Sequence, residues 1–362
     1  MRTYYVDETG FTGEDLLAED QPIFAQATND FSNDEARDLI QLVFGGVGSA
    51  ELKYSRLARN GRHHDKIVEL IRVLAVDPLR VGAWVAHKEY ALMTLIVDWW
   101  MEPFAYKFGL NLYKDGANHS MANMLFYCLE GFWSRAFRRK LLLHFQRMFR
   151  SRTQQRFDEC RAFVEKNRLS LAGSRDEILR YFALSFTELG YHHVVGVPER
   201  VLDIALPGLV LLGHNWNERH NGPWEVVHDH SSNMAKQKWM WDAYSSASLA
   251  PARFDHPGIV ARFPMNVNRT RFGDSSEERQ LQICDVLAGA CSSFLRPDRN
   301  GQQHLDYRAE LTKAGIEKLI VSGLWPSTDV SPEALGRRGW DGNIAIEWLA
   351  EQTRGKMPAS RS

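Results

Sequence analysis

Two acidic residues stand at the end of a predicted strand near the N-terminus, in the stretch YYVDETG that begins at Tyr4. Tyr4, Tyr5 and Val6 are residue types that favour a β-strand, and the Thr-Gly pairs that follow indicate a turn. Because side chains alternate along a strand, Asp7 shares a face with Tyr5, and Glu8 shares the other face with Val6. A carboxylate on a rigid strand end is well placed to bind a metal ion. The simpler interpretation is that the two acids only solvate the strand end.

Two further acids occur in otherwise apolar segments. Asp229 ends the predicted strand WEVVHD, although it could instead cap a helix that starts near Asn233. Ser231 or Ser232 could serve as that cap, so Asp229 is not needed for it. Asp285 lies in the middle of the predicted helix QLQICDVLAGA, where almost every other residue is apolar. Since a buried, unpaired carboxylate is costly, Asp285 needs a metal, a polar network or, as the alternative, an arginine.

Two strand-end acids and one helix-borne acid are the ligand types of a divalent-metal site. Mg²⁺ prefers oxygen ligands and few protein carboxylates, and substrate phosphates complete its shell. Two such ions about 4 Å apart would activate water and stabilise the leaving oxygen of a phosphodiester. Asp7, Asp229 and Asp285 therefore predict a site for Mg²⁺ or Mn²⁺.

Histidines cluster around Asp229 and offer an alternative. His228 and His230 share one face of the predicted strand and bracket the acid, which would suit zinc or manganese. The helical pattern of two histidines four residues apart with a glutamate between them is absent from the sequence. We therefore favour a single histidine, His230 or His228, as a proton shuttle beside the Mg²⁺ site.

Residues 133–163 form an arginine-rich, amphipathic segment with only Asp158 and Glu159 as acids. Arginine greatly exceeds lysine, which favours phosphate or carboxylate recognition because guanidinium makes bidentate contacts. We expect this segment to contact nucleic acid, DNA or RNA. The alternatives are docking of a protein partner or a second copy of the chain, binding to a membrane surface, and a plain solvated helix face. The expected contacts are Arg138, Arg139, Arg147 and Arg150.

The order of predicted elements indicates an α/β fold with a long helical insertion. Strands are expected at 3–8, 22–28, 50–54, 81–86, 224–229 and 259–263. Asp229 ends the strand at 224–229, and the strand at 81–86 is expected at the centre of the sheet. Helices are expected at 32–44, after a cap at Asp65, at 278–294 and in 305–350. Early and late strands must meet in one sheet, because neither end has enough strands to close a core alone. We expect four segments: 1–90 and 221–300 as the two parts of the α/β domain, 91–220 as the helical, arginine-rich insertion, and 301–362 as peripheral helices and tail.

Composition sets the class of protein. The chain has 362 residues, of which 44% are hydrophobic and 25% charged, and its formal net charge is −1. These values are typical of a globular protein with a sizeable core, and any nucleic-acid binding must come from local segregation of charge. The sequence has no leader-like N-terminus and no apolar run of about 18 residues. We therefore expect a cytoplasmic protein without membrane association.

Four stretches resemble the family known as domain of unknown function 3800. DETG (7–10) resembles its DESG start, ELKYS (51–55) its Glu-x-Lys strand, VVHDHS (226–231) its strand ending in Asp, and LQICDVLAGA (281–290) its LQLADLLAGA helix. Thr9 replaces the usual Ser, and Cys284 replaces the usual Ala. That family is similar to the ribonuclease H-like fold, in which carboxylates from the first strand, a later strand and a terminal helix hold catalytic Mg²⁺ or Mn²⁺.

The resemblance implies a mixed sheet flanked by helices, and a metal core of Asp7, Asp229 and Asp285. Glu8, Glu51 and Lys53 would lie nearby, with Glu51 or Glu89 as the fourth carboxylate and Lys53 in contact with nucleic acid. It further implies a metal-dependent nuclease in a bacterial mobile-element or anti-phage defence system. The alternative is a catalytically silent subunit that binds nucleic acid or a partner within a larger complex.

Overall fold

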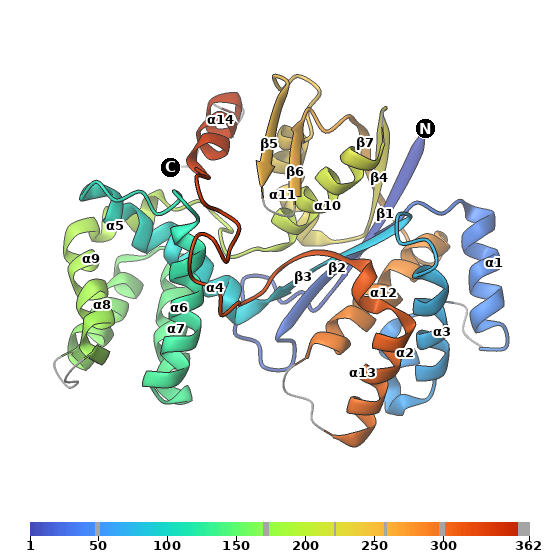
Figure 1. The fold of residues 1–362 in the computed structure, drawn as a ribbon, viewed down its shortest axis with the longest axis horizontal. Coiled ribbons are helices and arrows are strands. Elements are labelled where there is room, and N and C mark those ends of the chain that lie inside the picture. The colour runs from blue at the N-terminus through green and yellow to red at the C-terminus, as the bar shows by residue number, and fades with distance from the viewer. Residues whose placement is uncertain (48–50, 169–173, 221, 257–258, 297–300, 354–362) are drawn as a thin grey trace.

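The computed structural model describes residues 1–47, 51–168, 174–220, 222–256, 259–296 and 301–353. Its centre is a six-stranded mixed sheet with helices on both faces (Figure 1), so the expected α/β class is confirmed. The strands lie in the order β7-β4-β1-β2-β3-β8. Their bounds are β1 Arg2–Thr9, β2 Ile23–Asn29, β3 Val81–His87, β4 Trp224–Asp229, β7 Val267–Gly273 and β8 Ile320–Leu324.

Strands from the two ends of the chain pair directly, as the sequence predicts. β1 is antiparallel to β2 and parallel to β4, so that Tyr5 lies opposite Asn29 on one side and Val227 on the other. β3 is antiparallel to β2 and parallel to β8, while β7 is parallel to β4. Every strand of this sheet except β2 therefore runs in one direction. Their carboxyl ends share one edge, called the carboxyl edge below.

Helices cover both faces of the sheet. On the face that carries Tyr5, the long helix α12 packs against β1 and β2. The hydrophobic core on this face also includes residues of the neighbouring helices. These are α1 Asn33–Phe44, α2 Tyr54–Leu57, α3 His64–Leu74, α12 Arg279–Leu295 and α13 Gln302–Ala314. On the face that carries Tyr4 and Val6, the core is formed with α10 Ala205–Arg219 and α11 Ser232–Tyr244. The sheet is thus the middle of three layers.

The chain between β3 and β4 is helical, and most of it forms a lobe beside the sheet (Figure 1). A tight aromatic core holds this lobe together, with Trp100 in contact with Phe145, Phe149 and Phe186. The helical lobe comprises α4 Lys88–Ile96, a π-helical turn Val97–Met101, α5 Glu102–Lys107, α6 Ala117–Phe132, α7 Arg135–Ser151, α8 Gln154–Arg168 and α9 Ser174–Gly196. The last helix before β4, α10, returns to the sheet. The predicted boundaries of this insertion stay a prediction.

The structure corrects several predicted elements. The strand expected at 50–54 is wrong: residue 50 lies outside the described residues, and Tyr54 begins helix α2. β6 Ile259–Phe263 exists but pairs only with β5 Ala252–His256, in a separate two-stranded sheet. β3 is second from the edge rather than central, because β8 lies outside it. α3 begins at His64, so Asp65 lies in its first turn and does not cap it.

Three strands, β5, β7 and β8, have no counterpart in the prediction. β8 lies in the tail that was expected to contain only helices, before α14 Asn343–Thr353. Short 3₁₀ turns occur at Arg59–Gly61 and Ile316–Leu319. The helix expected at 32–44 is confirmed as α1, whose start carries a reciprocal cap between Ser32 and Glu35. No helix within the described ranges is both long enough and apolar enough to cross a membrane.

Candidate metal and nucleic-acid site

Asp7 lies at the carboxyl edge, at the end of central strand β1, with only 6% of its surface exposed. Its Oδ1 accepts a hydrogen bond from the backbone N–H of Glu8 at 2.7 Å. Burial raises the pKa of Asp7 to about 8, and the neighbouring carboxylates of Asp285 and Asp229 add to this rise. The Asp7 carboxylate is therefore unfavourable as an anion unless a cation lies beside it.

Asp229 reaches the same edge on the neighbouring strand. β1 and β4 are parallel, and Val6 lies opposite His228. The next residue on each strand is an acid, so Asp7 and Asp229 are neighbours across the two strands. The alternative role of Asp229 as a helix cap is wrong, because Ser231 precedes α11 and its Oγ accepts the N–H of Met234 at 3.3 Å. The two strand-end acids therefore lie side by side on the α12 face of the sheet.

Asp285 comes from α12, which packs against β1 and β2. Its Oδ2 accepts the backbone N–H of Tyr54 at 2.5 Å, and burial raises the pKa of Asp285. Among the described residues, Asp285 makes no ion pair with an arginine. The backbone of α12 approaches the start of α2 closely, since a Cβ on Gly289 would overlap the Tyr54 ring. This close approach explains why small residues follow Asp285 in the sequence.

Lys53 brings a positive charge to these acids. Its Nζ lies 2.9 Å from Ser275 Oγ, 3.2 Å from a Glu51 carboxylate oxygen and 4.0 Å from Asp229 Oδ2. Burial alone would lower the pKa of Lys53, but attraction to Asp285 and Asp7 outweighs it, so the pKa is raised. We call Asp7, Glu51, Lys53, Asp229 and Asp285 the acidic cluster.

Several predicted site residues lie outside the acidic cluster. Glu8 points to the opposite face of β1, where it accepts a hydrogen bond from Ser231 Oγ at 3.2 Å and lies 3.8 Å from His228 Nε2. His228 is fully buried there, whereas His230 is exposed and packs near Phe272. Glu8 and His228 therefore belong to a second polar group under the helices of the other layer.

Glu51 and Glu89, the two candidates for a fourth carboxylate, lie in different surroundings. Glu89 pairs with Arg138 at 2.9 Å on the helical lobe, whereas Glu51 accepts a hydrogen bond from Ser275 Oγ at 2.6 Å beside Lys53. The sequence analysis missed Ser275 and the Tyr54 N–H. Ser275 follows β7, a strand that was not predicted because its sequence is mostly polar. The Tyr54 N–H could not be predicted, because residue types do not show which backbone groups act as donors.

The acidic cluster has the donors of a hard-cation site. Carboxylates are the ligands that Mg²⁺ and Mn²⁺ prefer. The pKa of Asp7 is raised first by burial and then by the negative charges of Asp285 and Asp229. Within the described part of the chain, no three His, Cys, Asp or Glu side chains are spaced as ligands of one metal ion. The acidic cluster therefore suits Mg²⁺ or Mn²⁺ in its charge and its ligand types, but not in the spacing of its side chains.

The arginines of α7 separate into a paired and an exposed set. Arg138 is buried against Glu89, with 12% of its side chain exposed, and its guanidinium lies over the Phe126 ring. Arg138 is thus less available than the other three arginines for the expected contact with nucleic acid. Arg147 and Arg150 are exposed, as is Arg139 in a surface pair with Glu19. The basic stripe of α7 comprises Arg135, Arg139, Lys140, Arg147 and Arg150, all exposed.

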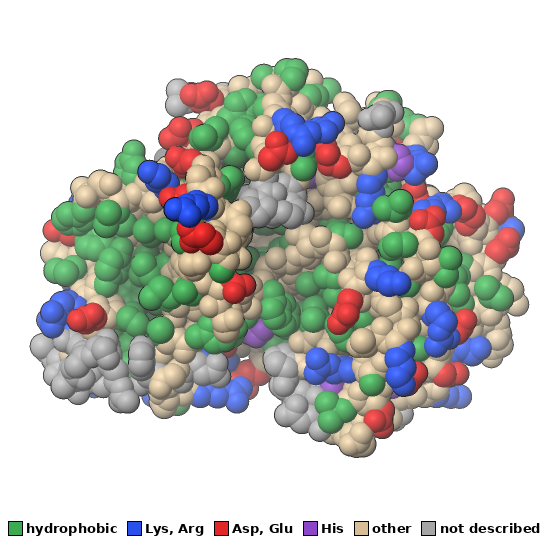
Figure 2. Space-filling view, viewed as in Figure 1, with side chains coloured by type: hydrophobic (Ala, Val, Ile, Leu, Met, Phe, Trp, Pro, Cys, Tyr) green, Lys and Arg blue, Asp and Glu red, His purple; other side chains and the backbone are tan. Residues whose placement is uncertain are grey.

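The next helix, α8, is arginine-rich, but each of its arginines is paired with an acid. Arg156, Arg161 and Arg168 each pair with an acid three residues away on the same helix. The lower outline of the molecule is indented between the side that carries α6 and α7 and the side that carries α12 and α13, and β1 points toward this indentation (Figures 1 and 2). Of the predicted basic segment, α7 therefore has the unbalanced charge.

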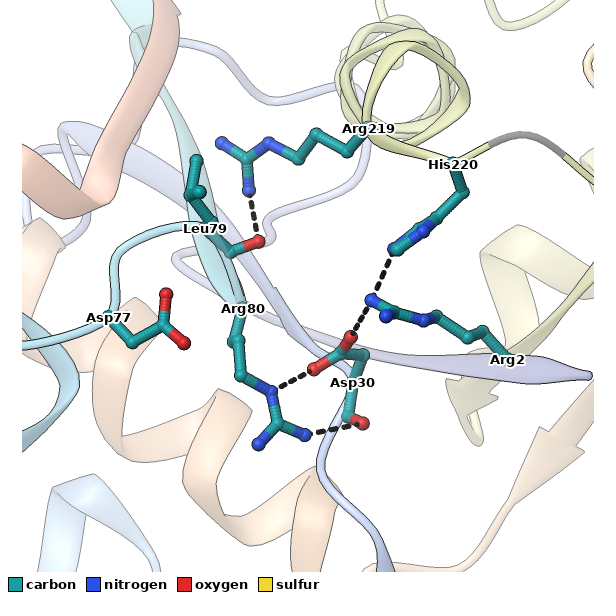
Figure 3. Close-up of a pocket in the computed structure, with 7 residues that line it drawn as sticks. All are labelled: Arg2, Asp30, Asp77, Leu79, Arg80, Arg219 and His220. Carbon is teal, nitrogen blue, oxygen red and sulfur yellow. Dashed lines mark hydrogen bonds and ion pairs between the residues drawn. The ribbon is translucent and has the colours of Figure 1, made fainter.

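A cavity of about 510 Å³ opens at the opposite end of β1 from Asp7 (Figure 3). Asp30 is buried there and binds both Arg2 and Arg80, each at 2.8–2.9 Å. Arg219 donates to the backbone oxygen of Leu79 at 2.7 Å. These contacts tie the starts of β1 and β3 to the end of β2. The cavity lining is Arg2, Asp30, Asp77, Leu79, Arg80, Arg219 and His220.

Comparison with known proteins adds no relative: no protein-family model, curated protein or solved structure matches this chain.

Proposed function

We propose that this chain is a divalent-metal-dependent nuclease that hydrolyses phosphodiester bonds of DNA or RNA. The observation that carries the proposal is the buried position of Asp7 beside Asp285 and Asp229 at one edge of the sheet, where burial and, after it, the two neighbouring carboxylates raise the pKa of Asp7 to about 8. Parallel strands end at this edge, and ligands of open α/β sheets bind outside such carboxyl ends. Three neighbouring carboxylates repel one another, so a cation bound between them would be favourable.

The placement of the three acids supports a ribonuclease H-like fold. They come from the first strand, from a later strand parallel to it, and from a helix that packs on both β1 and β2. This is the arrangement that the resemblance to domain of unknown function 3800 implies. The helical lobe joins β3 to β4 without disturbing their places in the sheet.

Asp7, Asp229 and Asp285, with Glu51, would hold Mg²⁺ or Mn²⁺. When bound, the metal would activate water and stabilise the charge on the leaving oxygen. The chain contributes rigidity: β1 fixes Asp7, and the Tyr54 N–H fixes one oxygen of Asp285. Because Asp7 has a raised pKa, cation binding near neutral pH would also release its proton.

The exposed basic stripe of α7 supports nucleic acid as the substrate. Among the described residues, Arg147 and Arg150 make no ion pair, whereas Arg139 pairs with Glu19 on the surface. Phosphate binding by such residues is independent of base sequence. The second candidate is a silent nucleic-acid-binding subunit. It is favoured by Lys53, which already supplies one positive charge to Glu51 and Asp229.

The test compares the wild type with Asp285→Asn in thermal melts with EDTA or Mn²⁺, beside cleavage of labelled DNA and RNA. We expect Mn²⁺ to raise the Tm of the wild type but not of Asp285→Asn, since a ligand stabilises only the state that binds it. Asp306→Asn, an exposed acid on α13, is the matched control and should respond like the wild type. Nucleic-acid binding without cleavage in Mn²⁺ would instead identify the silent subunit.

A further inference from the structure

Lys53 occupies an unusual position for a lysine, because its ammonium lies among the acids that the proposed function assigns to a metal. Nζ is 3.2 Å from Glu51 and 4.0 Å from Asp229, and Ser275 Oγ at 2.9 Å completes its described contacts. Asp285 and Asp7 lie close enough to raise the pKa of Lys53. One tethered cation therefore lies within 4.0 Å of two carboxylates, Glu51 and Asp229, and interacts electrostatically with two more.

The oxygen atoms around Nζ include those that a divalent cation would use. An ammonium and a divalent ion repel each other strongly at such separations, most of all where water is partly excluded. The two cations therefore compete for the same carboxylates. Lys53 can withdraw, because its four-carbon stem is flexible and 26% of its side chain is exposed.

We propose that Lys53 is a displaceable internal counter-cation of the acidic cluster. Its ammonium neutralises Glu51 and Asp229 in the metal-free protein and leaves these oxygens when a divalent ion binds. This inference rests on the proposed function for the identity of the incoming ion. It deepens that function, because metal affinity is then set by a competing residue of the chain itself.

A purely structural role for Lys53 gives a different expectation. Lys53 precedes α2, and its contacts with Glu51 and Ser275 tie this segment to the end of β7. If that tie were its whole role, removing the side chain would lower stability equally with and without metal. If Lys53 is a displaceable counter-cation, removing its side chain instead lowers the stability of the metal-free protein and raises its affinity for the metal.

The experiment measures Mn²⁺ affinity by isothermal titration and the Tm in EDTA for the full-length protein. We expect Lys53→Met to bind Mn²⁺ at least tenfold more tightly than the wild type, while its Tm in EDTA falls. Lys53→Arg keeps the charge and should stay within about threefold of the wild-type affinity. Arg56→Met is the matched control, because Arg56 is an exposed cation next to Glu51 but makes no described contact with Asp229. It should change the affinity less than threefold.

The outcomes separate the two proposals. If the wild type binds Mn²⁺ and Lys53→Met binds it equally or more weakly, the counter-cation role is overturned while the metal site stands. If neither the wild type nor Lys53→Met binds Mn²⁺, the proposed function fails, and with it the exchange of cations. Lys53→Gln keeps a donor for Ser275 and replaces Lys53→Met in the titration if that variant does not fold.

Discussion

At the scale of single residues, the position of Asp7 combines burial with like charge. A side chain selected only to solvate a strand end would be exposed, whereas Asp7 is nearly buried and faces two other acids. Burial and repulsion both disfavour its anion. A residue kept in such surroundings lowers the stability of the metal-free protein and is retained for another reason, which we propose to be cation binding.

Asp7→Asn should therefore separate stability from activity. We expect cleavage in Mn²⁺ to fall by at least about a hundredfold, because metal positioning supplies the nucleophile and the charge stabilisation. The Tm in EDTA should be unchanged or higher, because one member of a repelling group is neutralised. Cleavage assays beside thermal melts measure both. Unchanged cleavage would exclude Asp7 as a metal ligand, and a large fall in Tm would indicate a structural role.

At the scale of elements, patterns of residue type predicted those parts that bury an apolar face. β1, β3, β4, α1 and α12 follow from such patterns. β7 was missed because it is an edge strand with several polar residues, among them Asn268, Arg269 and Arg271. It therefore lacks the alternation of apolar and polar residues by which a strand is predicted. The strand expected around Leu52 failed because tertiary contacts decide this segment: Gln282 accepts the N–H of Leu52, and Asp285 that of Tyr54.

The basic stripe of α7 can be tested against the paired arginines of α8. We expect replacing Arg139, Arg147 and Arg150 together by Ala to weaken nucleic-acid binding regardless of sequence. The slope of log affinity against log salt should become shallower by about 0.9 for each lost phosphate contact with duplex DNA. Fluorescence anisotropy over a salt series measures both quantities.

The matched control replaces Arg156, Arg161 and Arg168 on α8 by Ala. This triple variant changes the net charge equally, but all three of its arginines are paired with acids, whereas in the α7 triple only Arg139 has a described ion pair, with Glu19. It should leave the salt slope close to that of the wild type. If both triple variants behave alike, the effect is one of net charge. If neither changes binding, α7 faces a protein partner or solvent.

At the scale of the whole molecule, the acidic cluster should make stability depend on pH. Asp7 has a pKa near 3.8 when unfolded and about 8 when folded. The folded state therefore binds more protons between these values, so the free energy of unfolding falls as pH rises from about 4 to 8. For one group this slope is at most about 1.4 kcal/mol per pH unit.

Urea unfolding in EDTA at pH 5, 6, 7 and 8 measures this dependence. The stability of the wild type relative to Asp7→Asn should decrease steadily across the series. Asp306→Asn, which lacks the buried surroundings, should run parallel to the wild type. Parallel curves for Asp7→Asn as well would mean that Asp7 does not titrate in this range.

The three candidate acids could be picked out from the sequence, but their surroundings could not. Asp7, Asp229 and Asp285 each interrupt an apolar pattern, which marks them in the sequence alone. The contacts of Glu51, Lys53 and Ser275 depend on how the chain around α2 meets the end of β7. No periodicity encodes such loop contacts, because they are fixed only when the sheet and α12 are in place.

The pairing of β1 with β4 also sets an order of events during protein synthesis. Val6 lies opposite His228, so one edge of β1 lacks its final partner until about 220 more residues have been made. At typical rates of translation this takes roughly 10–45 s. β2 and β3 can pair in that time and the helical lobe can form its own aromatic core, but Asp229 and Asp285 arrive last. A ribosome that stalls before β4 would thus hold a chain with a folded lobe, an open strand edge and an incomplete acidic cluster.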